Sequence, residues 1–238
     1  MNNIRDKVIV LTGASKGIGR VTAKKLSEYH PKFVLISRNL LELEELRQVL
    51  DCEDANVLLM EANVAYEKDC KRIVEEAVNK FGTIEILINN AAQFCRNKVI
   101  DMSVDDFDRV MSTNIRGVFI LTKLALPYMI MQNRGTIINI SSTAGKRGYV
   151  GGAAYAASKY ALNGFSECLL REVREYNIRV LTISPSAVDT SVKDEKDQKQ
   201  IGKGVFMRAE DVADSIILSL NLPQRGLIKD IEIWGTNP

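Results

Sequence analysis

The segment "VLTGASKGIGR" (residues 10–20) decides the fold, because it places three glycines at the junction between an apolar run and a helical pattern. Gly13, Gly17 and Gly19 follow an expected strand directly and open an expected helix. Glycines at such a junction allow a tight turn and let backbone N–H groups approach a pyrophosphate at the helix N-terminus. The spacing is G-x-x-x-G-x-G instead of the commoner G-x-G-x-x-G, and a glycine turn made for packing is the alternative. The position at the first strand and first helix favours a dinucleotide site.

Apolar runs and longer amphipathic segments alternate along the rest of the chain. The runs are continuously apolar, as expected when both faces of a sheet are covered. Strand–helix alternation without a repeat or linker predicts one α/β domain over 1–238, a Rossmann-type, doubly wound, seven-stranded parallel sheet with helices on both faces. The expected strands are 7–13, 32–37, 56–61, 84–89, 135–141, 178–184 and 228–234, and the expected helices are 17–29, 39–50, 66–82, 105–131, 153–176 and 209–221.

Composition restricts the class of partner. The 238 residues are 46% hydrophobic and 26% charged, as in a globular chain with a substantial core. Lys and Arg number 32 against 30 acidic residues, which argues against nucleic acid or an acidic membrane as the main partner. We expect no apolar run of transmembrane length and no signal peptide, so the prediction is a cytoplasmic protein.

The cysteines and the histidine restrict the chemistry. Four cysteines are scattered without paired spacing, which indicates free thiols in a reduced compartment. The only histidine, His30, precedes a proline at the expected end of a helix. This inventory argues against a metal site and against a Ser-His-Asp triad. Acid–base chemistry then has to come from Tyr, Lys or carboxylates.

The stretch "AAYAASKYALNG" (153–164) offers one such pair. Tyr155 and Lys159 are four residues apart, so a helix would present both on one face. A phenol titrates near ~10, and a neighbouring cation lowers its pKa by favouring the phenolate. The pair is either a tuned acid or a tyrosine packed in a helix interface of small residues. The spacing alone does not choose between them.

The end of the second expected strand bears on the cofactor. Dinucleotide-binding folds usually carry an acid there, which binds the ribose 2′-hydroxyl. This chain has "LISRN", with Ser37 and Arg38 and no carboxylate. Arg38 together with Lys16 of the glycine loop suits a 2′-phosphate. We therefore predict NADP(H), with NAD(H) less favoured and two ordinary surface cations as the alternative interpretation.

Six short motifs together resemble the classical short-chain dehydrogenase/reductase family over essentially the whole chain. Each is weak alone, but their order and spacing agree with the family. The resemblance implies an oxidoreductase that uses a nicotinamide cofactor on CH–OH groups. The motifs are "TGASKGIG" (12–19), "NNAA" (89–92), "STNIRG" (112–117), "INISSTAG" (138–145), "YAASK" (155–159) and "SPSAVDT" (184–190).

This resemblance implies catalytic roles for Asn114, Ser142, Tyr155 and Lys159. Tyr155 would protonate the substrate carbonyl oxygen, and Lys159 would lower the pKa of Tyr155 and hold the nicotinamide ribose. Ser142, thirteen residues before the tyrosine, would polarise the carbonyl in preference to its neighbour Ser141. Asn114 would help hold a water that connects the lysine to solvent, and a buried asparagine that satisfies backbone groups is its alternative.

The same resemblance, with the glycine loop, gives the expected cofactor contacts. Three positions depart from the family pattern: Asn63 replaces an Asp, Ala92 a Gly and Ser186 a Gly. We expect the fold to tolerate these changes, at some loss of cofactor affinity. The expected cofactor-binding residues are Gly13, Ser15, Lys16, Gly17, Ile18, Gly19, Ser37, Arg38, Asn63, Val64, Asn90, Ala91, Ala92, Tyr155, Lys159, Pro185, Val188 and Thr190.

Three segments should form the substrate face: 93–98, 145–152 and the polar stretch 186–205, which is either a lid or a solvated loop. The expected substrate contacts are Ser142, Phe94, Tyr149 and Tyr155, with Val150 as a further apolar wall residue. Three cations could bind an acidic substrate or could simply be solvated: Arg96, Lys146 and Arg147.

We therefore expect an NADPH-dependent reductase of a small ketone, aldehyde or hydroxy-acid-type substrate. A 3-oxoacyl reductase is one alternative, although the C-terminus lacks the "TGQ…DGG" ending of such enzymes. A non-catalytic NADPH-binding regulatory protein is the other. The resemblance also implies a homodimer or homotetramer formed through 105–131 and 153–176, with Phe119, Leu126 and Met129 on the apolar face of the first helix.

Overall fold

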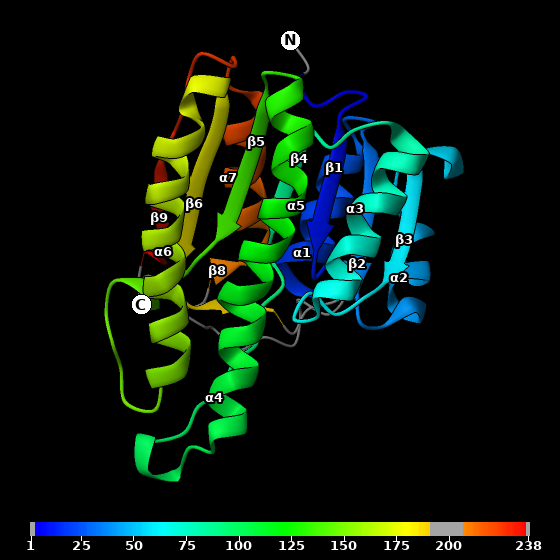
Figure 1. The fold of residues 1–238 in the computed structure, drawn as a ribbon. Coiled ribbons are helices and arrows are strands. Elements are labelled where there is room, and N and C mark those ends of the chain that lie inside the picture. The colour runs from blue at the N-terminus through cyan, green and yellow to red at the C-terminus, as the bar shows by residue number, and fades with distance from the viewer. Residues whose placement is uncertain (1–2, 191–206, 237–238) are drawn as a thin grey trace.

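All seven apolar runs form one parallel sheet, in the order β3-β2-β1-β4-β5-β6-β9 (Figure 1). The computed structural model describes residues 3–190 and 207–236. Every neighbouring pair of strands is parallel, so the predicted doubly wound Rossmann-type fold is confirmed. The strands are β1 (Val8–Thr12), β2 (Lys32–Ser37), β3 (Val57–Glu61), β4 (Ile86–Asn89), β5 (Gly135–Ile140), β6 (Ile178–Pro185) and β9 (Asp230–Ile233).

Helices cover both faces of this sheet, as predicted (Figure 1). Successive strand residues point to opposite faces, so the sheet separates two hydrophobic cores. Phe33 and Leu35 of β2 belong to the first core, and Val34 and Ile36 belong to the second. The first face carries α1 (Gly17–Ser27), α2 (Leu40–Arg47) and α7 (Ala209–Asn221), and the second carries α3 (Glu67–Phe81), α5 (Val118–Met131) and α6 (Ala153–Val173).

The helix expected over 105–131 contains a change of geometry in its middle. It consists of α4 (Val104–Met111), a π-helical stretch Ser112–Gly117, and α5. Such a stretch widens the helix locally and is frequent at functional sites. It places Asn114 in the interior, with 1% of its surface exposed. Gly117 at its end approaches the loop after β3, where an added Cβ would lie 2.6 Å from the Val64 carbonyl oxygen.

Val104–Met131 is also long and apolar enough, by length and composition alone, to cross a membrane. This corrects the expectation that no apolar run reaches that length. Of its most apolar window, 44% is buried inside the fold, where α5 packs against α3 and the sheet. Core helices of soluble proteins meet the same criterion, and the packing of α5 gives it that role.

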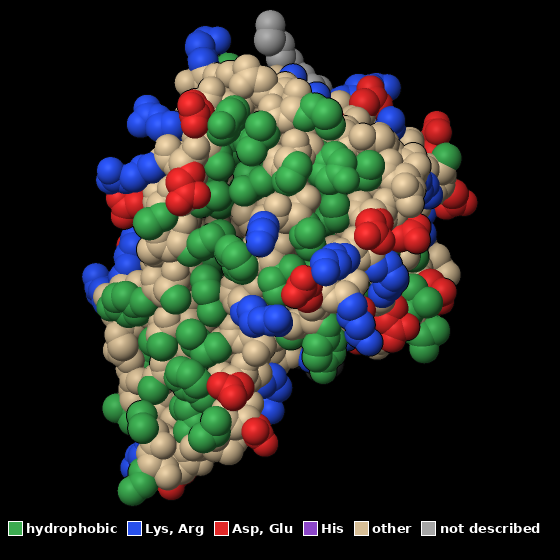
Figure 2. Space-filling view, viewed as in Figure 1, with side chains coloured by type: hydrophobic (Ala, Val, Ile, Leu, Met, Phe, Trp, Pro, Cys, Tyr) green, Lys and Arg blue, Asp and Glu red, His purple; other side chains and the backbone are tan. Residues whose placement is uncertain are grey.

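The outward face of α5 differs in part from the prediction. Phe119 is 47% exposed and Leu126 is half-buried. Met129 is fully buried and packs against Gly135 at the start of β5, so its expected place on the outward face is wrong. Figure 2 shows hydrophobic side chains continuing over the face that α4, α5 and α6 form.

A second, two-stranded sheet was not predicted. It pairs β7 (Val188–Asp189) with β8 (Met207–Arg208) in parallel. The pair holds Thr190 near the cleft, where the residue lines two cavities. Most of the expected lid segment 186–205 lies outside the described residues, and the structure places only its first part, 186–190.

Candidate active site

The loops that follow the parallel strands meet at one edge of the sheet. The strand order reverses between β1 and β4, and ligands of open α/β sheets bind at such a switch point. Two adjoining cavities of about 400 and 850 Å³ lie there. Both are lined by Ile18, Asn90, Ala92 and Thr190. They therefore form one cleft with two halves.

The glycine loop lines the smaller half and requires its glycines. Gly13 and Gly17 have φ of +66° and +53°, in the left-handed region that favours glycine. A Cβ on Gly19 would lie 2.1 Å from the Gly13 carbonyl oxygen. None of the described side chains caps α1, and its first turn holds no acid. The helix N-terminus therefore presents N–H groups and a positive dipole end, which fit a pyrophosphate.

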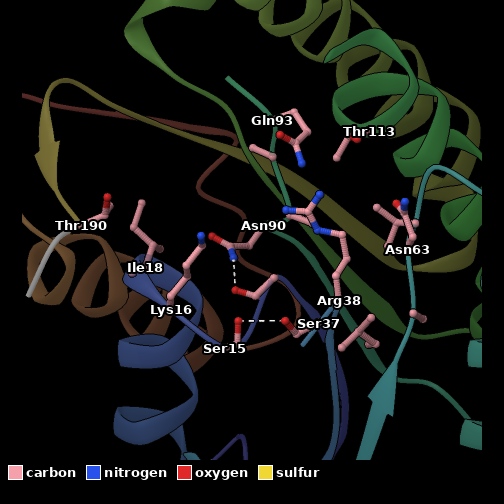
Figure 3. A pocket seen from close by; sticks show the side chains of 17 residues that line it. Ser15, Lys16, Ile18, Ser37, Arg38, Asn63, Asn90, Gln93, Thr113 and Thr190 are labelled. Carbon is pink, nitrogen blue, oxygen red and sulfur yellow. Dashed lines mark hydrogen bonds between the residues drawn. The ribbon is translucent and has the colours of Figure 1, made fainter. Parts of the chain in front are cut away.

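Asn90 fixes the shape of the glycine loop. Its Nδ2 donates to the Thr12 carbonyl oxygen at 2.9 Å. It also donates to the Gly13 carbonyl oxygen at 3.1 Å, the bond drawn in Figure 3. In return the Thr12 hydroxyl accepts from the backbone N–H groups of Asn90 and Ala91, both at 3.0 Å. The loops after β1 and β4 are thus tied together at the floor of the cleft. Asn90 and Ala91 shape the cofactor half as well as lining it.

Arg38 gives the smaller half its positive charge. Its guanidinium projects into the cavity, while Ser37 donates to Ser15 at 2.8 Å on the strand side (Figure 3). With its amide oxygen turned toward Arg38, Gln93 accepts from both terminal guanidinium nitrogens, at 2.7 and 3.1 Å. Lys16 lines the same cavity, and none of its described lining residues is acidic. This arrangement suits a phosphate on the adenosine ribose.

The loop after β3 closes the other side of this half. The Asn63 side-chain oxygen accepts from the Ala65 N–H at 3.1 Å, and the Asn63 N–H donates to Asp69 at 2.8 Å. These bonds hold Asn63 and Val64 against the cavity. An amide oxygen can accept a second hydrogen bond, so replacement of the family's Asp leaves an acceptor available for an adenine amino group.

Tyr155 and Lys159 of α6 lie together in the larger half. The Lys159 ammonium is 5.6 Å from the Tyr155 ring centroid and donates to the Ile140 carbonyl at 2.7 Å. Burial lowers the pKa of Lys159 to about 8. Burial also raises the pKa of Tyr155, against a smaller lowering by its hydrogen bond with Ser142. Burial outweighs this lowering, so the surroundings favour the protonated phenol. The lowering of the phenol pKa by Lys159 stays a prediction.

The two neighbouring serines have different surroundings. The Ser141 hydroxyl is buried and donates to Asn163 on α6 at 2.6 Å. Ser142 lines the larger half, where its hydroxyl accepts from the Ala144 N–H at 3.1 Å and reaches the Pro185 carbonyl at 3.5 Å. The structure therefore brings Ser142, and not Ser141, to the Tyr155 phenol, in agreement with the choice made from spacing.

Asn114 lies behind the cleft instead of in its wall. Its side-chain oxygen accepts from the Gln93 N–H at 2.7 Å, and its Nδ2 donates to the Gln93 carbonyl at 2.9 Å. It also donates to Ser158 at 3.0 Å, whose hydroxyl donates to the Tyr155 carbonyl at 2.7 Å. These contacts fit a buried asparagine that holds the loop after β4 against α6. The expected part of Asn114 in holding a water stays a prediction.

Aromatic side chains form part of the substrate wall. The Phe94 ring meets the Tyr155 ring edge to face, with centroids 5.2 Å apart. The Tyr149 ring lies against Gly152, where a Cβ would be 2.3 Å from a ring carbon. Val150 is 79% exposed and does not line the cavity, so its expected role in the wall is wrong.

The three candidate cations separate into two kinds. Arg96 and Arg147 line the larger half. Lys146 does not, because it pairs with Asp230 and Glu232 of β9 at 2.9 and 2.8 Å. Of the two interpretations given for Lys146, this pairing argues against the binding of an acidic substrate.

Two residues of the cleft make contacts that sequence reasoning did not anticipate, although Gln93 belongs to the expected substrate segment 93–98. Gln93 lines the cofactor half and contacts Arg38. Trp234, the residue after β9, lines the substrate half. Its ring centroid lies 5.1 Å from the guanidinium carbon of Arg147. Its position after a parallel strand was the available signal. In the described part of the chain, no cluster of three or more His, Cys, Asp or Glu side chains could hold a metal.

Comparison with known proteins agrees with this geometry. A family model described as short chain dehydrogenase matches residues 7–201. An NADP-dependent 3-hydroxy acid dehydrogenase of Schizosaccharomyces pombe is 32% identical, over 100% of this chain and 95% of that protein. The crystal structure of levodione reductase has a TM-score of 0.87 at 26% identity, covering 98% of this chain and 97% of that one. A 3-ketoacyl-(acyl-carrier-protein) reductase from Brucella melitensis, complexed with NADH, has a TM-score of 0.86 at 27% identity, covering 98% of both chains.

Proposed function

The chain belongs to the short-chain dehydrogenase family and is an NAD(P)-dependent oxidoreductase acting on CH–OH groups, and on that premise we propose that it reversibly reduces a small ketone, aldehyde or oxo acid with NADPH. The observation that carries this proposal is the meeting of Tyr155, Ser142 and Lys159 in a cavity that adjoins a glycine-lined one. A protein that only bound the cofactor would have no need of a protonated phenol beside a serine hydroxyl.

The preference for NADP(H) rests on Arg38. Known relatives use either cofactor, since one is named NADP-dependent and another is complexed with NADH. In this chain a guanidinium stands in the cavity after β2, with Lys16 on the other side and no acid among the described lining residues. A 2′-phosphate would find two cations there, whereas a 2′-hydroxyl would find no carboxylate acceptor.

The mechanism follows from the positions of the side chains. When bound, the nicotinamide supplies the hydride. Ser142 donates a hydrogen bond to the substrate oxygen as negative charge develops there, and Tyr155 delivers the proton. Lys159, buried beside the phenol, offers its charge and donor groups to the nicotinamide ribose. Asn114 holds the loop after β4 against α6 through its hydrogen bonds to Gln93 and Ser158.

Three broader features belong to the same proposal. Ser186, Ala187, Val188 and Thr190, from the described first part of the segment 186–205, border the substrate. Ser186, which replaces a Gly of the family, turns its hydroxyl toward Met207 at 3.4 Å and away from the cofactor half. The protein works in the cytoplasm, as its free cysteines suggest, and as a homodimer or homotetramer.

Steady-state assays with purified protein test the proposal. NADPH and NADH oxidation would be measured against ketones, aldehydes, oxo acids and 3-oxoacyl thioesters, with Tyr155→Phe and Arg38→Asp alongside. We expect Tyr155→Phe to lower kcat by roughly a hundredfold or more, with the Kd for NADPH, measured by calorimetry, unchanged. Arg38→Asp should abolish the preference for NADPH. Saturable NADPH binding without reduction of any carbonyl, or turnover that survives Tyr155→Phe, would contradict the proposal.

A further inference from the structure

The substrate half of the cleft is positively charged. Arg96, from the loop after β4, and Arg147, from the loop after β5, line the same cavity as the Tyr155 phenol. Lys159 adds a third cationic group. No Asp or Glu occurs among the described residues that line this cavity. A neutral ketone would gain nothing from this charge, whereas an anionic substrate would be attracted and oriented by it.

Arg147 is held in place by a neighbour that leaves its hydrogen-bonding edge available. Its guanidinium carbon lies over the Trp234 ring, 5.1 Å from the ring centroid. The Trp234 Nε1 donates to Glu232 at 2.7 Å, and this bond fixes the ring. Stacking occupies the face of a guanidinium and not its N–H donors. Glu232 in turn pairs with Lys146. Within residues 3–190 and 207–236, no carboxylate lies within ion-pair distance of Arg147.

Arg96 reaches the cavity from the opposite loop. Its stem packs near Gly151, where an added Cβ would be 3.4 Å from the Arg96 Cγ. Burial raises the pKa of the Tyr149 phenol, and the nearby charge of Arg96 partly opposes this rise. Arg96, like Arg147, forms no ion pair with a described residue.

Lys146 shows what an ordinary solvated cation looks like in the same loop. It faces away from the cavity and is neutralised by two carboxylates. Its neighbour Arg147 lines the cavity and forms no ion pair with a described carboxylate, although the pKa of Glu232 is lowered chiefly by Lys146 and slightly by Arg147. Lys146 therefore serves to pack the loop onto β9, whereas Arg147 remains available to a ligand.

We propose that the physiological substrate is an oxo acid, or the corresponding hydroxy acid, whose carboxylate is bound by Arg147 together with Arg96 while its carbonyl faces Ser142 and Tyr155. This inference rests on the proposed carbonyl reduction and adds the substrate class. Arginine binds a carboxylate through two parallel hydrogen bonds, so the pair would also fix which face of the carbonyl receives the hydride.

The test compares each oxo acid with its methyl ester, which keeps the carbonyl and removes the charge. Values of kcat/KM with NADPH would be measured for 2-, 3- and 4-oxo acids and their esters. The proteins are wild type, Arg147→Gln, Arg96→Gln and Arg147→Lys. The matched control is Lys68→Gln, which removes one exposed charge on α3, outside both halves of the cleft. Circular dichroism would verify folding.

We expect wild type to prefer at least one acid over its ester. Loss of a charge-assisted hydrogen bond of roughly 1.5–3 kcal/mol predicts that Arg147→Gln lowers kcat/KM for that acid by roughly ten- to a hundredfold. The ester should change by less than about threefold, because it lacks the charge that the arginine binds. Arg147→Lys should recover part of the loss, and Lys68→Gln should leave both values unchanged.

The outcomes separate the two proposals. Equal losses for acid and ester in Arg147→Gln, or a preference of wild type for every ester, would overturn the carboxylate site while leaving carbonyl reduction intact. Reduction of neutral ketones with no activity on any oxo acid would do the same. Absence of Tyr155-dependent reduction of every compound in the panel would remove the proposed function and, with it, this inference.

Discussion

Lys159 is a single residue whose burial has a measurable consequence for stability. Its pKa falls from 10.5 to about 8 in the folded protein, so between these values the unfolded chain binds the extra proton. Unfolding free energy therefore rises with pH across this window, by up to ~3 kcal/mol. Below about pH 8 the cost of the buried charge is fully present. We expect denaturant unfolding to show this rise in wild type relative to Lys159→Met between pH 7.5 and 10. A difference between the two proteins that does not vary with pH would contradict it.

Two buried threonines provide a second prediction. The same substitution, Thr→Val, should stabilise the protein at one position and destabilise it at the other. Thr22 of α1 is fully buried, and its hydroxyl has no hydrogen-bond partner among the described residues. Thr22→Val removes an unsatisfied group at nearly constant shape, so we expect stabilisation of about 1 kcal/mol and a Tm higher by ~2–4 °C. Thr122 of α5 is equally buried but accepts from Asn89 at 3.3 Å, so Thr122→Val should destabilise. Calorimetric melting of both variants checks the pair, and a lower Tm for Thr22→Val would refute the argument.

At the scale of residues, the family resemblance was informative where a motif has a fixed length. The interval of thirteen residues between Ser142 and Tyr155 pointed to the serine whose hydroxyl bonds the phenol, and its catalytic role stays a prediction. Sequence reasoning failed where tertiary pairing decides. Lys146 is neutralised by acids of β9 some eighty residues later, and Gln93 meets Arg38 across two loops. No local pattern contains such information.

Among the elements, the π-helical stretch makes a prediction through Gly117. Because an added Cβ would lie 2.6 Å from the Val64 carbonyl oxygen, Gly117→Ala should push the helix away from the adenosine side of the cleft. We expect a loss of stability of about 1–3 kcal/mol and a higher Kd for NADPH by calorimetry. Gly164 of α6 has open space around its Cβ position. Gly164→Ala is therefore the control, with a gain of up to ~1 kcal/mol and an unchanged Kd. Equal NADPH affinity in both variants would exclude the predicted contact.

Element boundaries were largely predictable because each core strand is a short apolar run and each helix a longer periodic one. The π-helical stretch was not, since one extra residue in a turn leaves the surrounding apolar pattern of 105–131 almost unchanged. The strands β7 and β8 were missed because each has two residues. Their pairing joins segments on either side of 191–206 and has no periodicity to detect.

For the whole molecule, the exposed apolar face of α4, α5 and α6 predicts self-association. Phe119 is 47% exposed and packs edge to face with Phe165 of α6, and Tyr160 is 50% exposed. Burying such residues against a second copy would remove apolar surface from water. We expect light scattering to report a dimer or tetramer for wild type and a smaller species for Phe119→Asp. A monomeric wild type at micromolar concentration would refute this.

The global topology was the most predictable property, and the reason is combinatorial. Once strands and helices alternate, right-handed crossovers and a buried parallel sheet leave few arrangements, and the glycine loop identifies the first strand. The substrate wall was the least predictable. It is assembled from the loops after β4, β5 and β6 and from Trp234 after β9, whose mutual positions exist only in the folded chain.

The Trp234 contact has a practical consequence. Trp234 is the only tryptophan in the sequence, and it lies in the substrate half of the cleft beneath Arg147. Fluorescence excited at wavelengths that tryptophan absorbs and tyrosine does not therefore originates from one known position. A charged ligand that draws the guanidinium off the indole ring would alter that emission directly. The molecule thus carries its own optical reporter of occupancy, and unlabelled wild-type protein can be screened against compound collections before any turnover assay exists.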